Sequence, residues 1–251
     1  MQISAVIITK NEELNLEKCL KSLSWADEIV VVDSGSQDRT LEIARSYGAR
    51  VIETPWLGFG KTKQFAVESA SHDWVFSIDA DEVVTEALQK DILSCAGSGD
   101  VGGYRVQRLS FYLGRAIRFS GWRSDAPLRL FDRRLGRFND KMVHESVEMG
   151  APVGMIRSQM LHYTYPTIAS HLAKIESYSG LGALQQFEKG KKISLFSAAM
   201  HGAGKFLKMY VFKLGFLDGK EGFILSVISS FGVALKYFKL WELRQKGRVN
   251  E

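Results

Sequence analysis

The chain has 251 residues, of which 45% are hydrophobic and 24% are charged, a composition that indicates a globular protein with one large domain or a domain with an appendage. Its net charge of +5 is unevenly distributed. Residues 1–100 carry 9 Lys and Arg against 17 Asp and Glu, whereas residues 101–251 carry 24 against 11. The basic second half is therefore expected to face an anionic partner, such as phosphates, lipid head groups or nucleic acid.

The cysteine content and the N-terminus exclude several classes of protein. Cys19 and Cys95 lie in different predicted elements and form no C-x-x-C pair, which argues against a disulfide framework and a structural zinc site. This pattern fits a reducing compartment. The apolar run at residues 3–9 follows no basic residue and is too short for the core of a signal peptide, so we expect a cytoplasmic protein.

Four short apolar segments in the first eighty residues predict buried strands, and helical patterns separate them. This β-α-β-α-β-α-β order predicts a parallel, doubly wound sheet. The right-handed crossover preference then places the strand ends at Thr9, Asp33 and Asp79 along one edge. The expected strands are Ile3–Thr9, Glu28–Asp33, Arg50–Glu53 and Trp74–Ile78. The expected helices are Asn11–Leu23, Thr40–Tyr47 and Lys61–Ala70, with Asn11 as a plausible N-cap.

Two carboxylates one residue apart, Asp79 and Asp81, follow the fourth predicted strand. Ligands of open α/β sheets bind outside the carboxyl ends of the strands. Two hard oxygen ligands at that edge suit Mg²⁺ or Mn²⁺, which in turn binds the phosphates of a nucleotide. The alternative is that this D-x-D occurs by chance and forms a solvated turn.

After residue 102 the pattern changes to short alternating segments, which predict antiparallel or mixed-sheet strands added to the first half. These segments are Tyr104–Arg108, Pro127–Phe131 and Met142–Glu148. In the second of them, Leu128 and Leu130 are expected on one face and Arg129 on the other. Residues 168–187 are helical in pattern.

The C-terminal segment contains two strongly apolar runs, Phe206–Leu217 and Phe223–Leu235, joined by Asp218 and Gly219. Each run is too short and too interrupted to span a bilayer, which takes roughly 20 residues. Basic flanks and aromatic residues instead predict a hairpin that lies on an anionic membrane surface. The alternative is a helical pair packed on the catalytic domain or on a second subunit. The flanking basic residues are Lys205, Lys208, Lys213, Lys220, Lys236, Lys239, Arg244, Lys246 and Arg248.

Three motifs of the first half resemble a known family. They are the segments at residues 5–12 (AVIITKNE), 30–40 (VVVDSGSQDRT) and 76–82 (FSIDADE). In order, spacing and content they resemble the inverting family 2 glycosyltransferases. The resemblance implies the GT-A fold, a mixed, mainly parallel sheet flanked by helices, with a C-terminal helical appendage. We expect a glycosyltransferase domain at residues 1–200 and an amphipathic helical tail at residues 201–251.

Four further segments narrow the resemblance to the bacterial subgroup that adds glucose to the lipopolysaccharide inner core. They begin at Trp56, Pro127, Arg137 and Leu161. The resemblance implies a UDP-hexose donor, with UDP-glucose the expectation, and a lipopolysaccharide or similar lipid-linked acceptor. Such an enzyme would lie on the cytoplasmic, anionic face of the inner membrane. We expect no nucleic-acid partner, because the basic residues interleave with apolar tail helices rather than with a recognisable reading motif.

The resemblance assigns the donor's base or ribose to the edge formed by the first two strands. Asp33 matches the family's aspartate at this position, although with Ser34, Gly35 and Ser36 after it a purely turn-forming role remains open. Thr9 and Glu12 are expected to contact the base or ribose. Asn11 lies at the same edge and can equally be only a helix cap.

Basic residues are expected near the donor phosphates. Lys63 matches the place where relatives often have a basic residue, with Lys61 as its competitor and a solvated helix lysine as the alternative. Arg129, Arg133 and Arg134 can hold the donor diphosphate or phosphates of the acceptor, because an arginine binds phosphate with paired hydrogen bonds. Solvated charges on an alternating strand are the alternative.

The resemblance divides the D-x-D between two roles. Asp81 is expected to ligate Mn²⁺ or Mg²⁺ directly, whereas Asp79 reaches ribose or metal-bound water. His162 is a candidate third ligand, because an imidazole from the later half completes the metal site in some relatives. The metal would neutralise the departing diphosphate. A structural histidine is the alternative for His162.

An inverting transfer needs one general base for the acceptor hydroxyl. The resemblance places Glu145 at the matching position, with Asp125 as the second candidate and His144 as either an orienting group or a base. Two other functions fit the sequence less well. A nucleotidyltransferase would need a glycine-rich phosphate loop after the first strand, which is absent from residues 9–12. A non-catalytic scaffold would not need Asp79, Asp81 and Glu145.

Overall fold

The computed structural model describes residues 2–95, 101–123, 125–140 and 145–249, with the side chains of residues 246–249 left undescribed. Contacts divide the chain into two compact units. Unit 1 comprises residues 1–109 and 124–162, and unit 2 comprises residues 110–123 and 163–251. The boundary expected at residue 200 therefore falls within unit 2. Each unit is described by itself.

The first eighty residues of unit 1 form the parallel α/β arrangement that the apolar segments predict. The order β3-β2-β1-β4 is parallel throughout. The first strand thus lies in the middle, where both of its faces are buried, which explains its unbroken apolar sequence. The strands are β1 (Ile3–Thr9), β2 (Glu28–Asp33), β3 (Arg50–Glu53) and β4 (Trp74–Asp79). The helices between them are α1 (Leu16–Lys21), α2 (Thr40–Ser46) and α3 (Phe59–Ser69).

Helix α1 is shorter than expected, and its N-cap is Asn15 rather than Asn11. Asn11 has a left-handed backbone with φ of 55°. Its side-chain Oδ1 accepts a hydrogen bond from the Gln37 N–H at 2.8 Å. Asn11 therefore joins two loops instead of starting a helix, which corrects the expectation that it is a helix cap.

Antiparallel strands extend the sheet beyond β4, as the alternating segments at residues 104–108 and 127–131 predict, whereas the segment at residues 142–148 lies partly outside the described residues and does not join this sheet. In the described residues the sheet has nine strands, in the order β3-β2-β1-β4-β8-β6-β11-β5, with β7 paired to β6. The strands β5, β7, β9 and β11 and the helix α4 have no counterpart among the expected elements. The elements are β5 (Glu82–Val84), α4 (Glu86–Cys95), β6 (Gly103–Tyr112), β7 (Arg115–Ala116), β8 (Leu128–Asp132) and β11 (Val153–Tyr165). A separate ribbon pairs β9 (Gly136–Phe138) with β10 (Val147–Met149).

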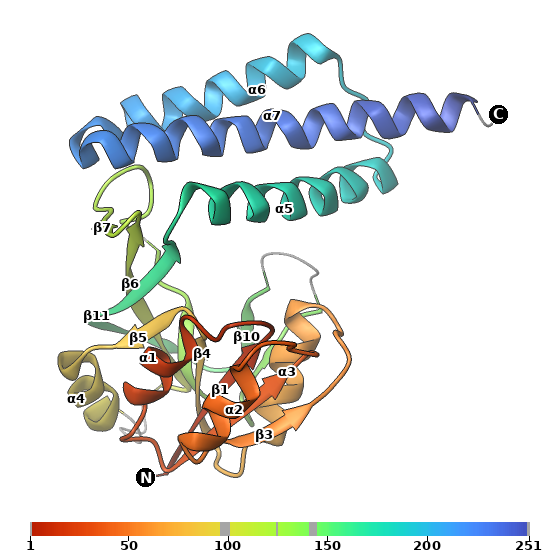
Figure 1. Cartoon of the computed structure of the whole chain (residues 1–251). Coiled ribbons are helices and arrows are strands. Elements are labelled where there is room, and N and C mark those ends of the chain that lie inside the picture. Colours follow the sequence, from red (N-terminus) through yellow and green to blue (C-terminus); the bar gives the residue numbers. More distant parts are fainter. Residues whose placement is uncertain (1, 96–100, 124, 141–144, 250–251) are drawn as a thin grey trace. The chain divides into compact units, whose positions relative to one another are not determined.

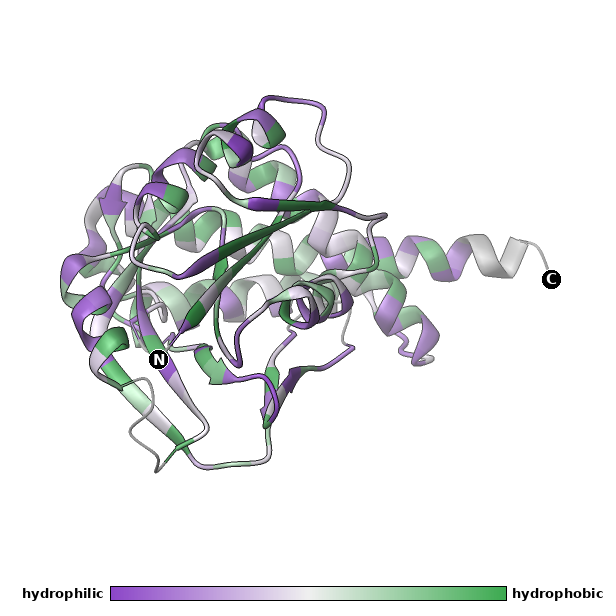
Figure 2. Cartoon of the chain, turned by 90° about the horizontal axis from the view of Figure 1, so that it is seen from below, coloured by the Kyte–Doolittle hydropathy of each residue, from purple (hydrophilic) through white to green (hydrophobic). Residues whose placement is uncertain are grey.

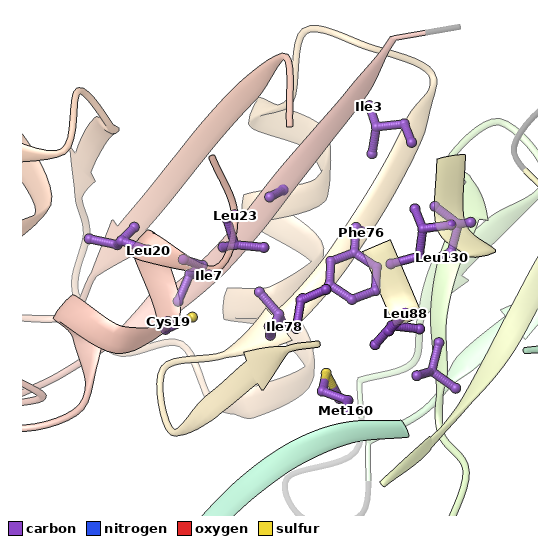
Figure 3. Packing of buried hydrophobic residues seen from close by; sticks show 14 of the residues in the cluster. Ile3, Ile7, Cys19, Leu20, Leu23, Phe76, Ile78, Leu88, Leu130 and Met160 are labelled. Atoms are coloured by element: carbon purple, nitrogen blue, oxygen red, sulfur yellow. The ribbon is translucent and has the colours of Figure 1, made fainter. Parts of the chain in front are cut away.

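The main core of unit 1 lies on one face of this sheet, beneath α1 and α4 (Figure 3). Ile3, Ile7, Phe76 and Ile78 project from the parallel strands into it. Helix α3 covers the opposite face of the sheet. There Val67 packs against the strand residues whose side chains point away from the main core. Alternate residues of β1 and β2 thus enter different clusters, as the two-residue period of a strand requires. Figure 2 shows the central strands as largely hydrophobic ribbons.

Unit 2 is mainly helical. Helix α7 packs against both α5 and α6 (Figure 1). Between α6 and α7 the chain forms a π-helical turn, η1, and a 3-10 turn, η2. The two apolar runs of the tail are thus parts of a larger helical arrangement that also includes α5. The elements are α5 (Ile168–Glu188), α6 (Leu195–Leu207), η1 (Lys208–Phe212), η2 (Gly215–Asp218) and α7 (Gly219–Val249).

The length of α7 corrects the expectation that the apolar runs are too short to span a bilayer. Of the described helices, one segment, Gly215–Gln245, is long and apolar enough to do so, with a mean hydropathy of 1.5. Length and composition alone are weak evidence, because a buried helix of a soluble protein meets the same criteria.

Candidate active site

The pairing of β1 with its two neighbours brings the three polar strand ends together. Thr9 lies opposite Asp33 in the β1–β2 pair, and Ile8 lies opposite Asp79 in the β1–β4 pair. The fold therefore brings Thr9, Asp33 and Asp79 to one edge of the sheet, as expected. This edge is the usual ligand-binding side of a parallel α/β sheet.

Asp33 is fully buried, and its carboxylate organises the loop that follows β2. It accepts hydrogen bonds from the backbone N–H groups of Gly35, at 2.9 Å, and Ser36, at 2.8 Å. Thr9 Oγ1 donates to the same carboxylate at 3.0 Å. The turn-forming role of Asp33 is thus realised in the structure, and Thr9 supports it from β1.

Glu12 lies in the loop between β1 and α1, close to this edge. Its backbone N–H donates to Thr40 Oγ1 at 2.8 Å. Its side-chain Oε2 accepts a hydrogen bond from Asn15 Nδ2 at 3.0 Å, which ties the loop to the start of α1. These contacts give the loop that begins at Asn11 a defined conformation beside Asp33.

Lys63 reaches the end of β4 from helix α3 and bridges two carboxylates. Its Nζ lies 2.8 Å from Asp79 Oδ1 and 2.9 Å from Glu145 Oε1. The Lys63 side chain is buried, so the alternative of a solvated helix lysine is wrong for this residue. Lys61 is exposed on the same helix and takes no part in the cluster. Glu145 lies 82 positions from Lys63 in the sequence, and only folding brings them together.

Arg129 binds the second oxygen of Asp79 from strand β8. Its guanidinium lies 2.7 Å from Asp79 Oδ2 and 2.6 Å from Glu82 Oε1. All of β8 is buried, including Arg129. The prediction that one side of this strand faces solvent is therefore wrong. The reason is that residues of β8 enter both core clusters, Leu130 one and Leu128 and Phe131 the other, so both faces of the strand are covered. Arg129 Nε is buried without a hydrogen-bond partner among the described residues.

Glu82 and Arg108 complete this network, and neither is among the predicted site residues. Glu82 is fully buried and accepts hydrogen bonds from the Asp79 N–H, at 2.9 Å, and from Arg108 at 3.1 Å. Arg108 also pairs with Asp125. A third acidic residue directly after Asp79-Ala80-Asp81 was the available sequence signal for Glu82. For Arg108 the signal was weak, because a charged residue on an alternating strand usually faces solvent.

These ion pairs fix the charges in the cluster. Burial alone would raise the pKa of the Asp79 carboxyl, but Arg129 and Lys63 outweigh it and hold that pKa well below its usual range. Burial would lower the pKa of Lys63, but the attraction of Asp79 and then Glu145 raises it, although Arg129 opposes them. Asp79 is therefore anionic and Lys63 cationic at neutral pH, in a buried setting where their interaction is strong.

The pairing of β5 with β11 places His162 beside the second carboxylate of the D-x-D. His162 lies opposite Glu82 in that pair, and its Nε2 is 3.4 Å from Asp81 Oδ2. No cluster of three or more His, Cys, Asp or Glu within the described ranges is arranged to hold a metal ion. Asp81 and His162 still fit Mg²⁺ or Mn²⁺ as a partial set, because such ions are held by one or two protein ligands together with substrate phosphates. Both oxygens of Asp79 are already bound to cationic side chains.

The other predicted residues fall in different places. Asp125 is engaged by Arg108, and His144 lies outside the described residues. Arg133 donates to the Val67 carbonyl, and Arg134 pairs with Asp132 and Asp73. Asp73 precedes the first residue of β4, at the opposite end from Asp79. The structure thus brings Arg129, but neither of the two following arginines, to the cluster.

Comparison with known proteins assigns the class. The sequence matches the family described as Glycosyl transferase family 2 over residues 4–158. The chain belongs to glycosyl transferase family 2 and is a glycosyltransferase. This assignment confirms the expected GT-A class of α/β fold and argues against a nucleotidyltransferase.

Its relatives include proteins of similar length. It is 33% identical to the lipopolysaccharide core biosynthesis glycosyltransferase LpsC of Rhizobium meliloti, over 100% of this chain and 97% of that protein. An uncharacterized glycosyltransferase of Rickettsia typhi is 34% identical, over 98% of this chain and 89% of that protein. Among solved structures it is similar to glucosyl-3-phosphoglycerate synthase from Mycobacterium tuberculosis, crystallised with Mn²⁺, UDP and phosphoglyceric acid. That likeness has a TM-score of 0.37 and 28% identity, over 44% of this chain and 43% of that one.

Proposed function

We propose that this glycosyltransferase moves a hexose, with inversion, from a nucleotide sugar onto a lipopolysaccharide core or a similar membrane-borne glycan. The observation that carries the proposal is the convergence of Asp79, Lys63 and Glu145 at the carboxyl ends of the strands. A nucleotide sugar carries its negative charge on the diphosphate, and a buried ammonium beside the D-x-D suits that charge. Similarity to the lipopolysaccharide core enzyme supports the class of acceptor.

Glu145 is our candidate for the general base. Its carboxylate would take the proton of the acceptor hydroxyl as that oxygen attacks the anomeric carbon. The bond from the anomeric carbon to the diphosphate breaks in the same displacement, and the diphosphate leaves with the electron pair. A single displacement inverts the configuration, so an α-linked donor gives a β-linked product. Lys63 holds Glu145 at 2.9 Å and would orient it.

The donor nucleotide is proposed to lie along the edge formed by β1 and β2. Thr9 and Asp33 support the loop at this edge, and Glu12 flanks it. These residues are our candidates for contacts to the base and ribose. Asp79 and Arg129 would define the phosphate side, and UDP-glucose is the donor that we expect. Asn11 completes the edge through its contact with Gln37.

Asp81 and His162 would hold Mn²⁺ or Mg²⁺. Asp79, whose carboxylate is paired with Lys63 and Arg129, would support this site. When bound, such an ion stabilises the negative charge of the departing diphosphate. We place the enzyme on the cytoplasmic face of the inner membrane, where a lipid-linked acceptor is presented. The apolar and basic segment at residues 201–251 supports this location.

The proposal is tested by separating donor binding from transfer. Glu145→Gln should bind UDP-glucose, measured by calorimetry with Mn²⁺, within about threefold of the wild type, while glucosyl transfer falls by at least about 100-fold. The matched control is Glu148→Gln, an exposed carboxylate on β10, which should retain both properties. If Glu145→Gln transfers at the wild-type rate, Glu145 is not the base. If no nucleotide sugar binds the wild type, the donor class is wrong.

A further inference from the structure

Unit 2 exposes a dense group of large apolar side chains where α6 leads into α7. We call residues 207–217 the apolar turn. Phe212 is 77% exposed, and every residue from Val211 to Leu214 is exposed. Single exposed apolar residues are normal on a protein surface, whereas a contiguous group indicates an interaction site. Its large exposed apolar side chains are Leu207, Val211, Phe212, Leu214, Phe216 and Leu217.

The apolar turn is held in one conformation by buried contacts. The Asp218 carboxylate accepts hydrogen bonds from the backbone N–H groups of Arg118, at 2.9 Å, and Phe119, and from Ser120 Oγ at 2.9 Å. Gly215 packs so closely that a Cβ there would lie 2.7 Å from the Met209 carbonyl oxygen. Met209 is itself buried in a small core. The aromatic side chains are therefore presented outward from a fixed support.

The charge around the apolar turn is positive. Lys208, Lys213 and Lys220 are exposed, and none of them pairs with an acidic side chain in the part of the chain that the structure describes. The neighbouring acidic side chains are both engaged in contacts. Asp218 is buried under its hydrogen bonds, and Glu221 pairs with Arg115 at 3.2 Å. The apolar turn and the lysines beside it complement a membrane surface, which has an apolar interior and anionic head groups.

The C-terminal part of α7 makes contacts that an inserted helix would lose. Lys239 Nζ lies 2.6 Å from Glu176 Oε1, and the Arg244 guanidinium donates to the Phe187 carbonyl at 2.7 Å. Tyr237 and Leu240 are buried in a cluster formed with α5 and α6. Polar groups transferred to hydrocarbon without their partners are costly. Tyr237, Lys239, Leu240 and Arg244 thus tie this part of α7 to the rest of unit 2, although the helix is long enough to span a bilayer.

We infer that the apolar turn is a membrane-docking element, in which Phe212, Leu214 and Phe216 enter an anionic phospholipid bilayer while the adjacent lysines contact its head groups. Docking through a turn keeps the helices of unit 2 packed, and none of the described helices then crosses the bilayer. The inference rests on the proposed function only in that a membrane-borne acceptor makes such docking useful. It narrows the membrane contact from the whole tail to this turn.

The test is cosedimentation of the full-length protein with vesicles. Vesicles of phosphatidylcholine with 30% phosphatidylglycerol should bind the wild type, and pure phosphatidylcholine vesicles should bind it much less. The double variant F212S/F216S should lose at least tenfold in partition coefficient. The triple variant Lys208→Gln, Lys213→Gln, Lys220→Gln should lose roughly fivefold per lysine, as expected when charge near an anionic surface is removed. Its dependence on salt should decrease accordingly.

Matched controls come from α4 in unit 1. Leu93→Ser removes an apolar side chain that is 51% exposed, and Lys90→Gln removes an exposed lysine. Both variants should bind vesicles like the wild type. Circular dichroism checks that every variant is folded. Equal vesicle binding by F212S/F216S and the wild type would overturn the inference. A second result would also overturn it: the wild type dimerises in ultracentrifugation, and F212S/F216S abolishes the dimer without changing vesicle binding. The turn would then contact a second copy of the chain.

A second readout separates this inference from the proposed function. Transfer to a soluble acceptor analogue without vesicles should be unchanged in F212S/F216S. If vesicle binding behaves as expected but no variant and no wild-type protein transfers sugar, the proposed donor or acceptor is wrong and the docking element stands. If transfer is normal and vesicle binding ignores the turn, the docking inference alone fails.

Discussion

The Nζ atom of Lys63 lies 2.8 Å from Asp79 Oδ1, and the same ammonium binds Glu145. One buried cation therefore joins the D-x-D on β4 to our candidate base, which comes from a segment 82 positions away. The arrangement predicts that Lys63 affects both donor binding and transfer.

Replacing Lys63 with Met should reduce kcat/KM by at least about 100-fold and lower the free energy of unfolding by about 3–5 kcal/mol, because it leaves two carboxylates without their buried cation. Lys63→Arg should restore part of both properties. Lys61→Met, on the exposed side of the same helix, should change stability by less than about 0.5 kcal/mol. Steady-state kinetics and urea denaturation provide the measurements. Wild-type stability and kinetics in Lys63→Met would contradict the bridging role.

Glu82 is expected to position Asp79 rather than to contact substrate. Glu82→Gln removes the anion that Arg129 and Arg108 share, so we expect a loss of about 3–5 kcal/mol in unfolding free energy. A double-mutant cycle of Glu82→Gln with Arg129→Met should give a coupling energy above about 1 kcal/mol, because the two groups touch. Glu86→Gln, in the first turn of α4, is the exposed control. Additive effects of the two substitutions would show that the contact is energetically unimportant.

A divalent ion should stabilise the enzyme only when Asp81 and His162 are present. In the presence of UDP, saturating Mn²⁺ should raise the melting temperature, and excess EDTA should reverse the rise, because a ligand that binds the folded state shifts apparent stability. Asp81→Asn and His162→Gln should weaken or abolish this shift without unfolding the protein. His72→Gln, on the loop before β4, should behave like the wild type. An unaltered shift in Asp81→Asn would place the ion elsewhere.

His171 makes the stability of unit 2 dependent on pH. Burial, with a smaller contribution from Lys174, lowers the pKa of His171 to about 4 from an ordinary value of 6.5. The unfolded chain therefore binds a proton between these values that the folded chain does not, so stability falls as the pH drops from 6.5 towards 4. We expect a loss of about 2 kcal/mol, within the roughly 3.4 kcal/mol that corresponds to the full shift.

The measurement for His171 compares slopes. His171→Phe should retain the stacking on Tyr165 and lose this part of the pH dependence, although it removes the 3.1 Å hydrogen bond to the Tyr112 hydroxyl. Leu172→Gln, an exposed neighbour, should retain the wild-type slope. Urea denaturation at pH 7.5, 6, 5 and 4 gives both slopes. Parallel curves for His171→Phe and the wild type would rule out His171 as the titrating group.

Local pattern was sufficient for the parallel half of the sheet. The apolar runs ending at Thr9, Asp33 and Asp79 are strands with the expected pairing, because strands buried on both faces need nearly continuous apolar sequence. The D-x-D could be recognised for the same reason, since it follows directly from the position of a strand end. The alternating segment before Arg133 was also a strand, but its exposure was predicted incorrectly.

The sequence by itself determined the class of fold, the family and the edge of the sheet at which chemistry would occur. Only the tertiary structure decided which charges meet there: that Arg129 and Lys63 are buried, that Glu82 binds both Arg129 and Arg108, and that Glu145 returns to Lys63. The physical reason is that strand and helix periodicity is a local property of neighbouring residues. A buried charge, in contrast, is stable only beside a partner, and here the partners lie dozens of residues away.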